Sequence, residues 1–251
     1  MAPQVRQVSE SVYCIQRKAY LSCSYLIARP QGVVLVDAGM DGQGGDALAG
    51  LAAVARRVSD VRAIVLTHWH NDHSSGAARM KELSGATVYY HEAAAPKFTR
   101  AAAARGVRRW LAARLPDAGR LAPFKGLLDA APPRALAADR FVRDGDVIED
   151  GLLVMETPGH EDGHLSFWFE PERVLFAGDA LAVVGDHVSY ISRWLTKDVE
   201  AARRSMVRCL ELPARAICPG HRYPLVGPSS EHLAAKRQEA LSLRRWPIVG
   251  C

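Results

Sequence analysis

One run of residues near the first third of the chain constrains the fold more than any other feature. It reads Thr67-His68-Trp69-His70-Asn71-Asp72-His73 and directly follows the apolar residues 63–66. Alternate residues of an extended chain point the same way, so His68 and His70 can reach one ion. Asp72 and His73 lie where the chain turns, and they can face a second point close by. The run therefore predicts a strand that ends in a cluster of metal-binding side chains.

Packing alone does not explain this run. Each imidazole or carboxylate would bring a polar group that needs a partner into a half-buried place. A bound metal ion supplies that partner. Imidazole and carboxylate together suit zinc, and they also suit iron or manganese, so the ligand types leave the element open.

Three further groups of the same kind follow apolar runs later in the chain. They are His160 in Thr157-Pro158-Gly159-His160, Asp179 in Gly178-Asp179, and His221 in Pro219-Gly220-His221. A glycine precedes each of them, and glycine lets the backbone turn sharply and approach a site closely. We expect all three side chains at strand ends.

The pattern of apolar runs predicts a layered α/β fold. Strands are expected at residues 11–17, 24–29, 32–37, 63–67, 87–91, 152–157, 165–170, 174–177 and 216–218, and helices at 46–58, 75–83, 93–128, 198–212 and 230–245. With 49% hydrophobic and 24% charged residues, the chain is not dominated by disorder or coiled coil. We expect a single domain over residues 1–251, with a helical insert at about 93–140 that ends near Pro132-Pro133.

Taken in order, these motifs resemble the metallo-β-lactamase superfamily of metal-dependent hydrolases. The resemblance spans residues 32–221 and includes His-x-His-x-Asp-His, Thr-Pro-Gly-His, Gly-Asp and Pro-Gly-His. It implies a four-layer αββα sandwich, the metallo-β-lactamase fold, with the metals at one edge and the helical insert covering the substrate.

The resemblance also implies a role for each matching residue. The first metal would be held by His68, His70 and His160, the second by Asp72, His73 and His221, and Asp179 would bridge them. Asp37, in Val36-Asp37-Ala38-Gly39, would orient ligands from behind, and His164 would order the loop after His160. The cofactors would be two divalent ions, with Zn²⁺ favoured and iron or manganese also allowed.

The implied activity is hydrolysis of an ester, lactone or thioester bond in a small acyl substrate. Two metals can lower the pKa of bound water from about 15.7 to about 7, which supplies a hydroxide nucleophile at neutral pH. Asp72 would take or orient the proton of that water. A serine nucleophile is not expected, because Gly-x-Ser-x-Gly does not occur in the sequence.

Three alternatives compete with this interpretation. The same metals can serve a phosphodiesterase or nuclease, or a single iron can serve an oxidoreductase of the persulfide-dioxygenase type. The third alternative is a zinc protease, because His160-Glu161-Asp162-Gly163-His164 matches the His-Glu-x-x-His pattern of that class. That pattern binds zinc only when it lies on a helix. Gly159 and Gly163 disfavour a helix there.

Charge points to where a substrate can bind. Residues 96–140 hold ten Lys and Arg against three Asp, a net charge of +7, so the rest of a chain of net charge +5 carries −2. Such a segment can be the solvated face of a helix, or it can steer an anionic substrate, in which case Arg108 and Arg109 are candidates. His187 and Tyr190 are candidates for touching substrate. Trp110, Phe124 and Trp194 can line a pocket, although such aromatic residues are more often in a core.

The remaining expectations concern location and partners. No segment reaches the roughly 18 apolar residues of a membrane span, and the first residues do not resemble a secretory signal. We expect a cytoplasmic protein that binds neither membrane nor nucleic acid, with a homodimer as one candidate assembly. Five cysteines without a Cys-x-x-Cys motif indicate free thiols.

Overall fold

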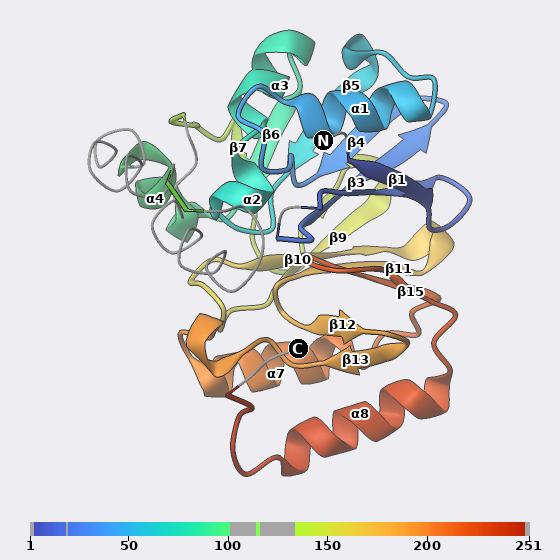
Figure 1. Ribbon diagram of the computed structural model, residues 1–251, viewed down its shortest axis with the longest axis vertical. Coiled ribbons are helices and arrows are strands. Elements are labelled where there is room, and N and C mark those ends of the chain that lie inside the picture. Colours follow the sequence, from blue (N-terminus) through green and yellow to red (C-terminus); the bar gives the residue numbers. More distant parts are fainter. Residues whose placement is uncertain (1–2, 19, 101–113, 116–133, 249–251) are drawn as a thin grey trace.

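Four layers make up the fold in the computed structural model, which describes residues 3–18, 20–100, 114–115 and 134–248 (Figure 1). Two β-sheets lie face to face in the middle, and helices cover the outer side of each sheet. The arrangement confirms the expected α/β architecture, an αββα sandwich.

The first sheet has seven strands in sequence order. They are β1 (Gln4–Gln7), β2 (Val12–Gln16), β3 (Cys23–Arg29), β4 (Gly32–Val36), β5 (Val61–Val65), β6 (Thr87–Tyr90) and β7 (Arg140–Phe141). Neighbours from β1 to β4 are antiparallel, whereas β4 to β7 are parallel. Strands β4 and β5 therefore end at the same edge.

The second sheet has six strands in the order β15-β14-β11-β10-β9-β8. They are β8 (Val147–Ile148), β9 (Leu152–Glu156), β10 (Leu165–Phe169), β11 (Val174–Gly178), β14 (Ala216–Pro219) and β15 (Leu225–Val226). Because β10 is antiparallel to both β9 and β11, and β11 is parallel to β14, the strands β9, β11 and β14 end at one edge. A separate hairpin joins β12 (Ala182–Val184) to β13 (His187–Ser189).

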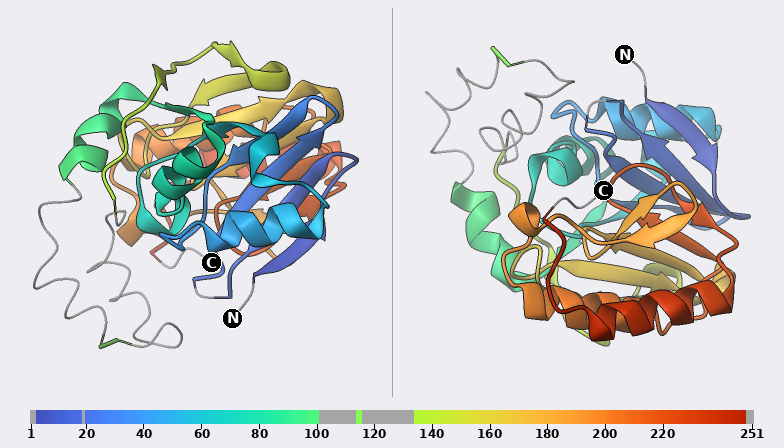
Figure 2. Two further views of the ribbon diagram at one scale, coloured as in Figure 1. Left: turned by 90° about the horizontal axis from the view of Figure 1, so that it is seen from above. Right: turned by 60° about the horizontal axis from the view of Figure 1, so that its bottom comes forward.

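Helices form the two outer layers. Those beside the first sheet are α1 (Gly45–Ala53), α2 (Asn71–Ser74), α3 (Ala77–Ser84) and α4 (Ala95–Arg100), and those on the second are α7 (Val199–Cys209) and α8 (Ser230–Ser242). The right view of Figure 2 shows α8, in red, along the outer side of the second sheet, on the opposite side of the molecule from α1.

Three apolar clusters fill the spaces between the four layers. The middle cluster lies between the sheets, and its aromatic side chains are Tyr25, Tyr89, Phe167, Phe169 and Phe176. Leu51 and Met80 belong to the cluster under α1 and α3, and Met206 belongs to the cluster under α7. Burying such side chains stabilises a fold by about 1.5–3 kcal/mol each, so the sheets form a rigid frame for the groups at their edge.

All nine expected strands are present, within two residues at each end. The short strands β1, β7, β8, β12, β13 and β15 were not expected. Helix α1 ends at Ala53 instead of residue 58, because Ala55 adopts a left-handed φ of 53° and the N–H of Arg56 donates to the carbonyl of Leu51 (2.9 Å). Of the expected insert, residues 101–113 and 116–133 lie outside the described part of the chain.

No helix within the described residues is long and apolar enough to cross a membrane. The four cysteines in that part of the chain are free, as expected, and all four are buried.

Candidate metal centre

The edge where β4, β5, β9, β11 and β14 end carries every strand-end group named from the sequence. The β5 segment continues through His68 to His70, and the chain then turns into the short helix α2, which carries Asp72 and His73. His160 follows β9, Asp179 follows β11, and His221 follows β14. Carboxyl ends of strands are the usual place for ligands in α/β folds.

Three imidazoles form the first group. The Nδ1 atom of His70 lies 3.1 Å from Nε2 of His68 and 3.0 Å from Nε2 of His160. His68 and His160 are buried, while the His70 side chain is 22% exposed. Three nitrogens, two from the segment after β5 and one from the loop after β9, thus converge on one point.

A second group lies beside the first. His73 Nε2 is 3.4 Å from His221 Nε2, and Asp72 Oδ2 is 3.6 Å from the former and 3.4 Å from the latter. The side chains of Asp72 and His221 are 15% and 29% exposed, so they form the solvent-facing side of the cluster together with His70.

Asp179 lies between the two groups. One carboxylate oxygen, Oδ2, is 3.5 Å from Nε2 of His160 in the first group and 3.5 Å from Nε2 of His221 in the second. The other oxygen, Oδ1, is 3.8 Å from Nε2 of His73. The carboxylate can therefore contact ions in both groups.

Hydrogen bonds behind the rings fix which nitrogen of each imidazole faces the centre. Carbonyl and carboxylate oxygens only accept, so a ring nitrogen that contacts one must carry the proton. This rule applies to Nδ1 of His73, His160 and His221, which donate to Asp37 Oδ2 (3.0 Å), the Leu195 carbonyl (2.5 Å) and the Tyr20 carbonyl (3.0 Å). Their Nε2 lone pairs are left free to bind a metal.

Asp37 orients two parts of this arrangement at once. Its carboxylate accepts from the backbone N–H and the hydroxyl of Thr67 (both 2.8 Å) and from His73. Since the Thr67 hydroxyl proton goes to Asp37, its oxygen accepts from Nδ1 of His68 at 3.0 Å. Asp37 is 2% exposed and has a left-handed φ of 59°, a conformation that aspartate tolerates better than most residues.

His164 packs beside the ring of His68, with 5.2 Å between the ring centroids, and both of its ring nitrogens form hydrogen bonds within the loops behind the centre. Its Nε2 accepts the N–H of Asp179 (2.9 Å), so Nδ1 carries the proton and donates to the Thr157 hydroxyl (2.9 Å). The Thr157 hydroxyl donates to Ser166, which donates to the Ala177 carbonyl. This chain of bonds holds the loop that carries Asp179, and burial keeps His164 neutral by lowering its pKa to about 3.

The ionised carboxylates of the centre favour a nearby positive charge. Burial disfavours ionisation of Asp72 and Asp179, but the neighbouring imidazoles hold the pKa of both carboxyls below the usual range. Burial disfavours the charged form of His73 and His221 as well, yet the same carboxylates raise the pKa of His73 to about 10 and of His221 to about 9. Burial lowers the pKa of His160 to about 4. In the metal-free protein, two protons balance carboxylates that a cation would otherwise balance.

Two local features fit a metal at this place. Among the described residues, no hydrogen-bond donor reaches the buried Oδ1 of Asp179. Gly220 leaves the space beside it open, because a Cβ there would lie 2.1 Å from that oxygen and 2.7 Å from Cε1 of His73. Ligand atoms form three sets, each within 4.8 Å: His68, His70 and His160; His68, His73 and Asp179; Asp72, His73 and His221. An imidazole and carboxylate set of this kind suits a divalent ion.

The candidates for touching substrate lie apart from the cluster. Tyr190 is 4% exposed, and its hydroxyl donates to Glu239 of α8 (3.0 Å). His187 pairs with Asp186 and packs against the ring of His232. Arg108 and Arg109 lie outside the described residues, as do Trp110 and Phe124. Trp194 is 83% exposed, so its interpretation as a core residue is wrong.

The sequence did not reveal several neighbours of the cluster. Glu161 Oε1 lies 3.6 Å from Nε2 of His70, and Lys197 pairs with the same glutamate (3.5 Å). Glu161 belongs to the His-Glu-x-x-His motif, but that segment forms a bend and turn with Gly163 at a φ of 73°, so the zinc-protease interpretation is excluded. The backbone carbonyls of Tyr20 and Leu195 could not be predicted, because every residue has a carbonyl and the residue type does not show which one accepts a hydrogen bond.

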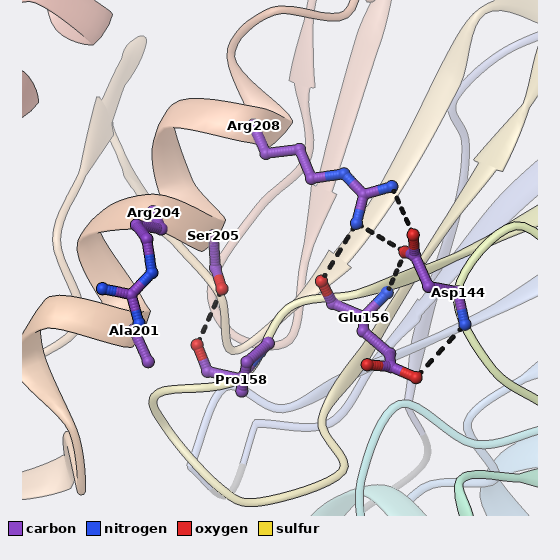
Figure 3. Close-up of a pocket in the computed structure, with 7 residues that line it drawn as sticks. All are labelled: Asp144, Glu156, Pro158, Ala201, Arg204, Ser205 and Arg208. Carbon is purple, nitrogen blue, oxygen red and sulfur yellow. Dashed lines mark hydrogen bonds and ion pairs between the residues drawn. The ribbon is translucent and has the colours of Figure 1, made fainter.

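A separate cavity of about 310 Å³ lies behind the His160 loop, between that loop and α7 (Figure 3). Ser205 donates to the carbonyl of Pro158 (2.7 Å), and Arg208 donates to the carbonyl of Glu156 (3.4 Å). These contacts tie α7 to the segment that carries His160.

Comparison with known proteins places the chain in a family. Residues 19–221 match the metallo-beta-lactamase superfamily, and the chain belongs to it. This membership confirms the expected resemblance and the expected enzyme class, a metallo-hydrolase of that superfamily.

Individual relatives agree with the assignment. A hydroxyacylglutathione hydrolase from Methylobacterium nodulans is 31% identical over 81% of this chain and 67% of its own length. A metallo-beta-lactamase family protein from Thermus thermophilus, TTHA1429, has a TM-score of 0.65 at 26% identity, covering 94% of this chain and 81% of that one. TTHA1623 in a di-iron-bound form has a TM-score of 0.63 at 25% identity, covering 85% and 93%. The chain spans about half to two thirds of the length of the hydroxyacylglutathione hydrolases it matches.

Proposed function

We propose that this protein is a hydrolase that cleaves an acyl bond, with a thioester as the favoured substrate, using two divalent metal ions. The carrying observation is the position of Asp179, within 3.5 Å of an imidazole nitrogen in each of two separate ligand groups. A single carboxylate between two such groups favours a pair of ions over one.

The arrangement of the ligand atoms supports the assignment that the family resemblance implies. The first ion would be held by His68, His70 and His160, the second by Asp72, His73 and His221, and Asp179 would contact both. Zinc is the favoured element, because nitrogen and carboxylate oxygen are its usual ligands alongside cysteine. Iron remains an alternative, and the di-iron form of TTHA1623 supports both that element and the presence of two ions.

Ions held by these residues would polarise a carbonyl and would make hydroxide available at neutral pH. The protein supplies the rest. Asp72 is ionised and 15% exposed, so its carboxylate can accept the proton of the attacking water at the solvent-facing side of the cluster. Asp37, Thr67 and the Leu195 carbonyl hold the imidazoles in place and keep their lone pairs aimed inward.

The bond type is inferred from relatives. Several curated relatives are hydroxyacylglutathione hydrolases, whose name denotes cleavage of a glutathione thioester. Esters and lactones present the same acyl carbon to the nucleophile. A single-iron dioxygenase would leave the second group, Asp72, His73 and His221, without a role, so we favour hydrolysis over that alternative.

A substrate panel tests the proposal. Protein of measured metal content would be assayed with hydroxyacyl thioesters of glutathione, simple esters, lactones, a phosphodiester and a β-lactam. We expect the highest kcat/KM on an acyl substrate, with a loss of at least about 100-fold in the Asp179→Asn variant. Turnover of the phosphodiester alone, or sulfur-dependent oxygen uptake with one iron per chain, would contradict the proposal.

A further inference from the structure

An apolar patch lies next to the metal centre on a turn that the protein holds rigidly. Trp194 and Leu195 belong to the 3₁₀ turn η5 (Arg193–Leu195), and their exposed fractions are 83% and 51%. Ile248, 63% exposed, lies beside them, because its carbonyl accepts from the hydroxyl of Ser192 (2.6 Å). We call Trp194, Leu195 and Ile248 the apolar platform.

The backbone of this turn forms part of the metal centre. The Leu195 carbonyl accepts the Nδ1 proton of His160, so the residue after Trp194 contacts a metal ligand directly. The N–H groups of Lys197 and Asp198 both donate to the Gly159 carbonyl, at 2.7 and 2.9 Å. These bonds place the turn behind the His160 ring. Lys197 also pairs with Glu161 (3.5 Å), whose Oε1 lies 3.6 Å from Nε2 of the solvent-facing His70. The platform therefore lies next to the first group of imidazoles and near its open side.

The turn is held from behind by the last described residues of the chain. The indole N–H of Trp246 donates to the Ile191 carbonyl (2.7 Å), and the N–H of Arg193 donates to the Pro247 carbonyl (2.9 Å). The Ser192 carbonyl accepts from the N–H of Leu195 (2.9 Å) and the hydroxyl of Thr196 (2.9 Å). Exposure of Trp194 is thus a property of an ordered turn, held open to solvent by bonds on its inner side.

The exposed apolar side chains of the platform indicate a binding site. Large apolar side chains that cluster on a surface with polar surroundings mark binding sites. Polar groups do surround the platform, since Lys197 pairs with Glu161 and Asp162 next to it. We propose that the apolar platform binds the hydrocarbon part of the acyl substrate, so that the enzyme prefers longer straight-chain acyl groups. This inference rests on the proposed function, since the occupant is the substrate of the same centre.

Binding of straight-chain carboxylates, the product class, tests the platform without requiring turnover. Dissociation constants of butyrate, hexanoate, octanoate and decanoate would be measured by calorimetry on the metal-loaded protein. Full burial of a methylene strengthens binding about fourfold, and a platform that covers one side of the chain should give about half of that free energy, roughly twofold per methylene. In Trp194→Ala and in Leu195→Ser the gain per methylene should fall clearly below the wild-type value.

Leu241→Ala is the matched control, since Leu241 is 55% exposed but lies on α8. Its gain per methylene should equal that of the wild type. An equal gain in wild type, Trp194→Ala and Leu195→Ser would overturn the inference, and so would a change in oligomeric state in these variants without a change in the gain, which would mark a contact between copies of the chain.

The two proposals fail separately. If the wild type hydrolyses no thioester, ester or lactone, the proposed function fails, regardless of how tightly the straight-chain carboxylates bind. If it hydrolyses them without any dependence on chain length, and binds butyrate as well as decanoate, the platform inference fails while the function stands.

Discussion

Replacing Asp37 with asparagine tests how the second metal ion is held. The carboxylate is buried and accepts three hydrogen bonds, two from Thr67 and one from His73 Nδ1. An amide has one oxygen, so its NH₂ group must face either the Thr67 backbone N–H, which contacts Oδ1, or the Thr67 hydroxyl and His73, which both contact Oδ2. Facing His73, it would favour the tautomer with the proton on Nε2, and that nitrogen would lose its lone pair.

The size of the effect follows from these bonds. A hydrogen bond to a charged group contributes about 1.5–3 kcal/mol. A tenfold change in affinity equals about 1.4 kcal/mol. Losing one of the three hydrogen bonds to Asp37 should therefore lower the affinity for the second ion about 10- to 100-fold. The first ion should be affected less, because Asp37 reaches the first group only through Thr67 and His68.

Competition against a chromogenic chelator, followed over two equivalents of zinc, measures both affinities. Asp41→Asn serves as control, because Asp41 lies four residues on and its carboxylate accepts from the Gln43 backbone N–H (2.9 Å). The control should bind both ions as the wild type does. If Asp37→Asn also binds both ions within twofold of the wild-type affinities, the orientation of His73 by Asp37 is refuted.

Three further predictions concern other parts of the centre and the core. Gly220→Ala should lose the second ion, because its Cβ would lie 2.1 Å from Oδ1 of Asp179; calorimetry that still shows two binding steps would contradict this. Metal-free protein should be most stable near pH 6.5 in urea unfolding. The folded-state pKa of His160, about 4, lies below the unfolded value of about 6.5, so stability falls as the pH drops below about 6.5. The folded-state pKa of His73, about 10, lies above the unfolded value, so stability also falls as the pH rises toward 10. A steady rise in stability from pH 7 to 9 would be inconsistent with that sign. Burial raises the pKa of the Cys209 thiol to about 12, so it should resist a disulfide reagent at pH 8 in the native protein and react in urea.

The fold was predictable where apolar runs are long. The strand at Cys23–Arg29 contains the apolar run Tyr25-Leu26-Ile27-Ala28, and such a run identifies a buried strand without its partners. Strands of two or three residues, such as Val147–Ile148 and Ala182–Val184, have no pattern of their own, because only pairing with a neighbour defines them. The polar strand Gln4–Gln7 shows why edge strands escape detection.

The site was predictable where residue type carries the chemistry. Histidine and aspartate at strand ends predict a metal site, and the structure brings all seven predicted ligand residues together. Backbone groups carry no such signal, so the carbonyls of Tyr20 and Leu195 that set the imidazole tautomers were beyond reach. Tyr190 shows the converse difficulty: its residue type fits a substrate contact, but packing against Trp246 places its ring in the core under α8.

The metal content of the purified protein tests the central claim most directly. Zinc-saturated, desalted protein would be examined by elemental analysis and by mass spectrometry under native conditions. We predict two ions per chain in the wild type and one in His221→Ala, which removes a ligand of the second group only. One ion or none in the wild type would contradict the account of two groups joined by Asp179.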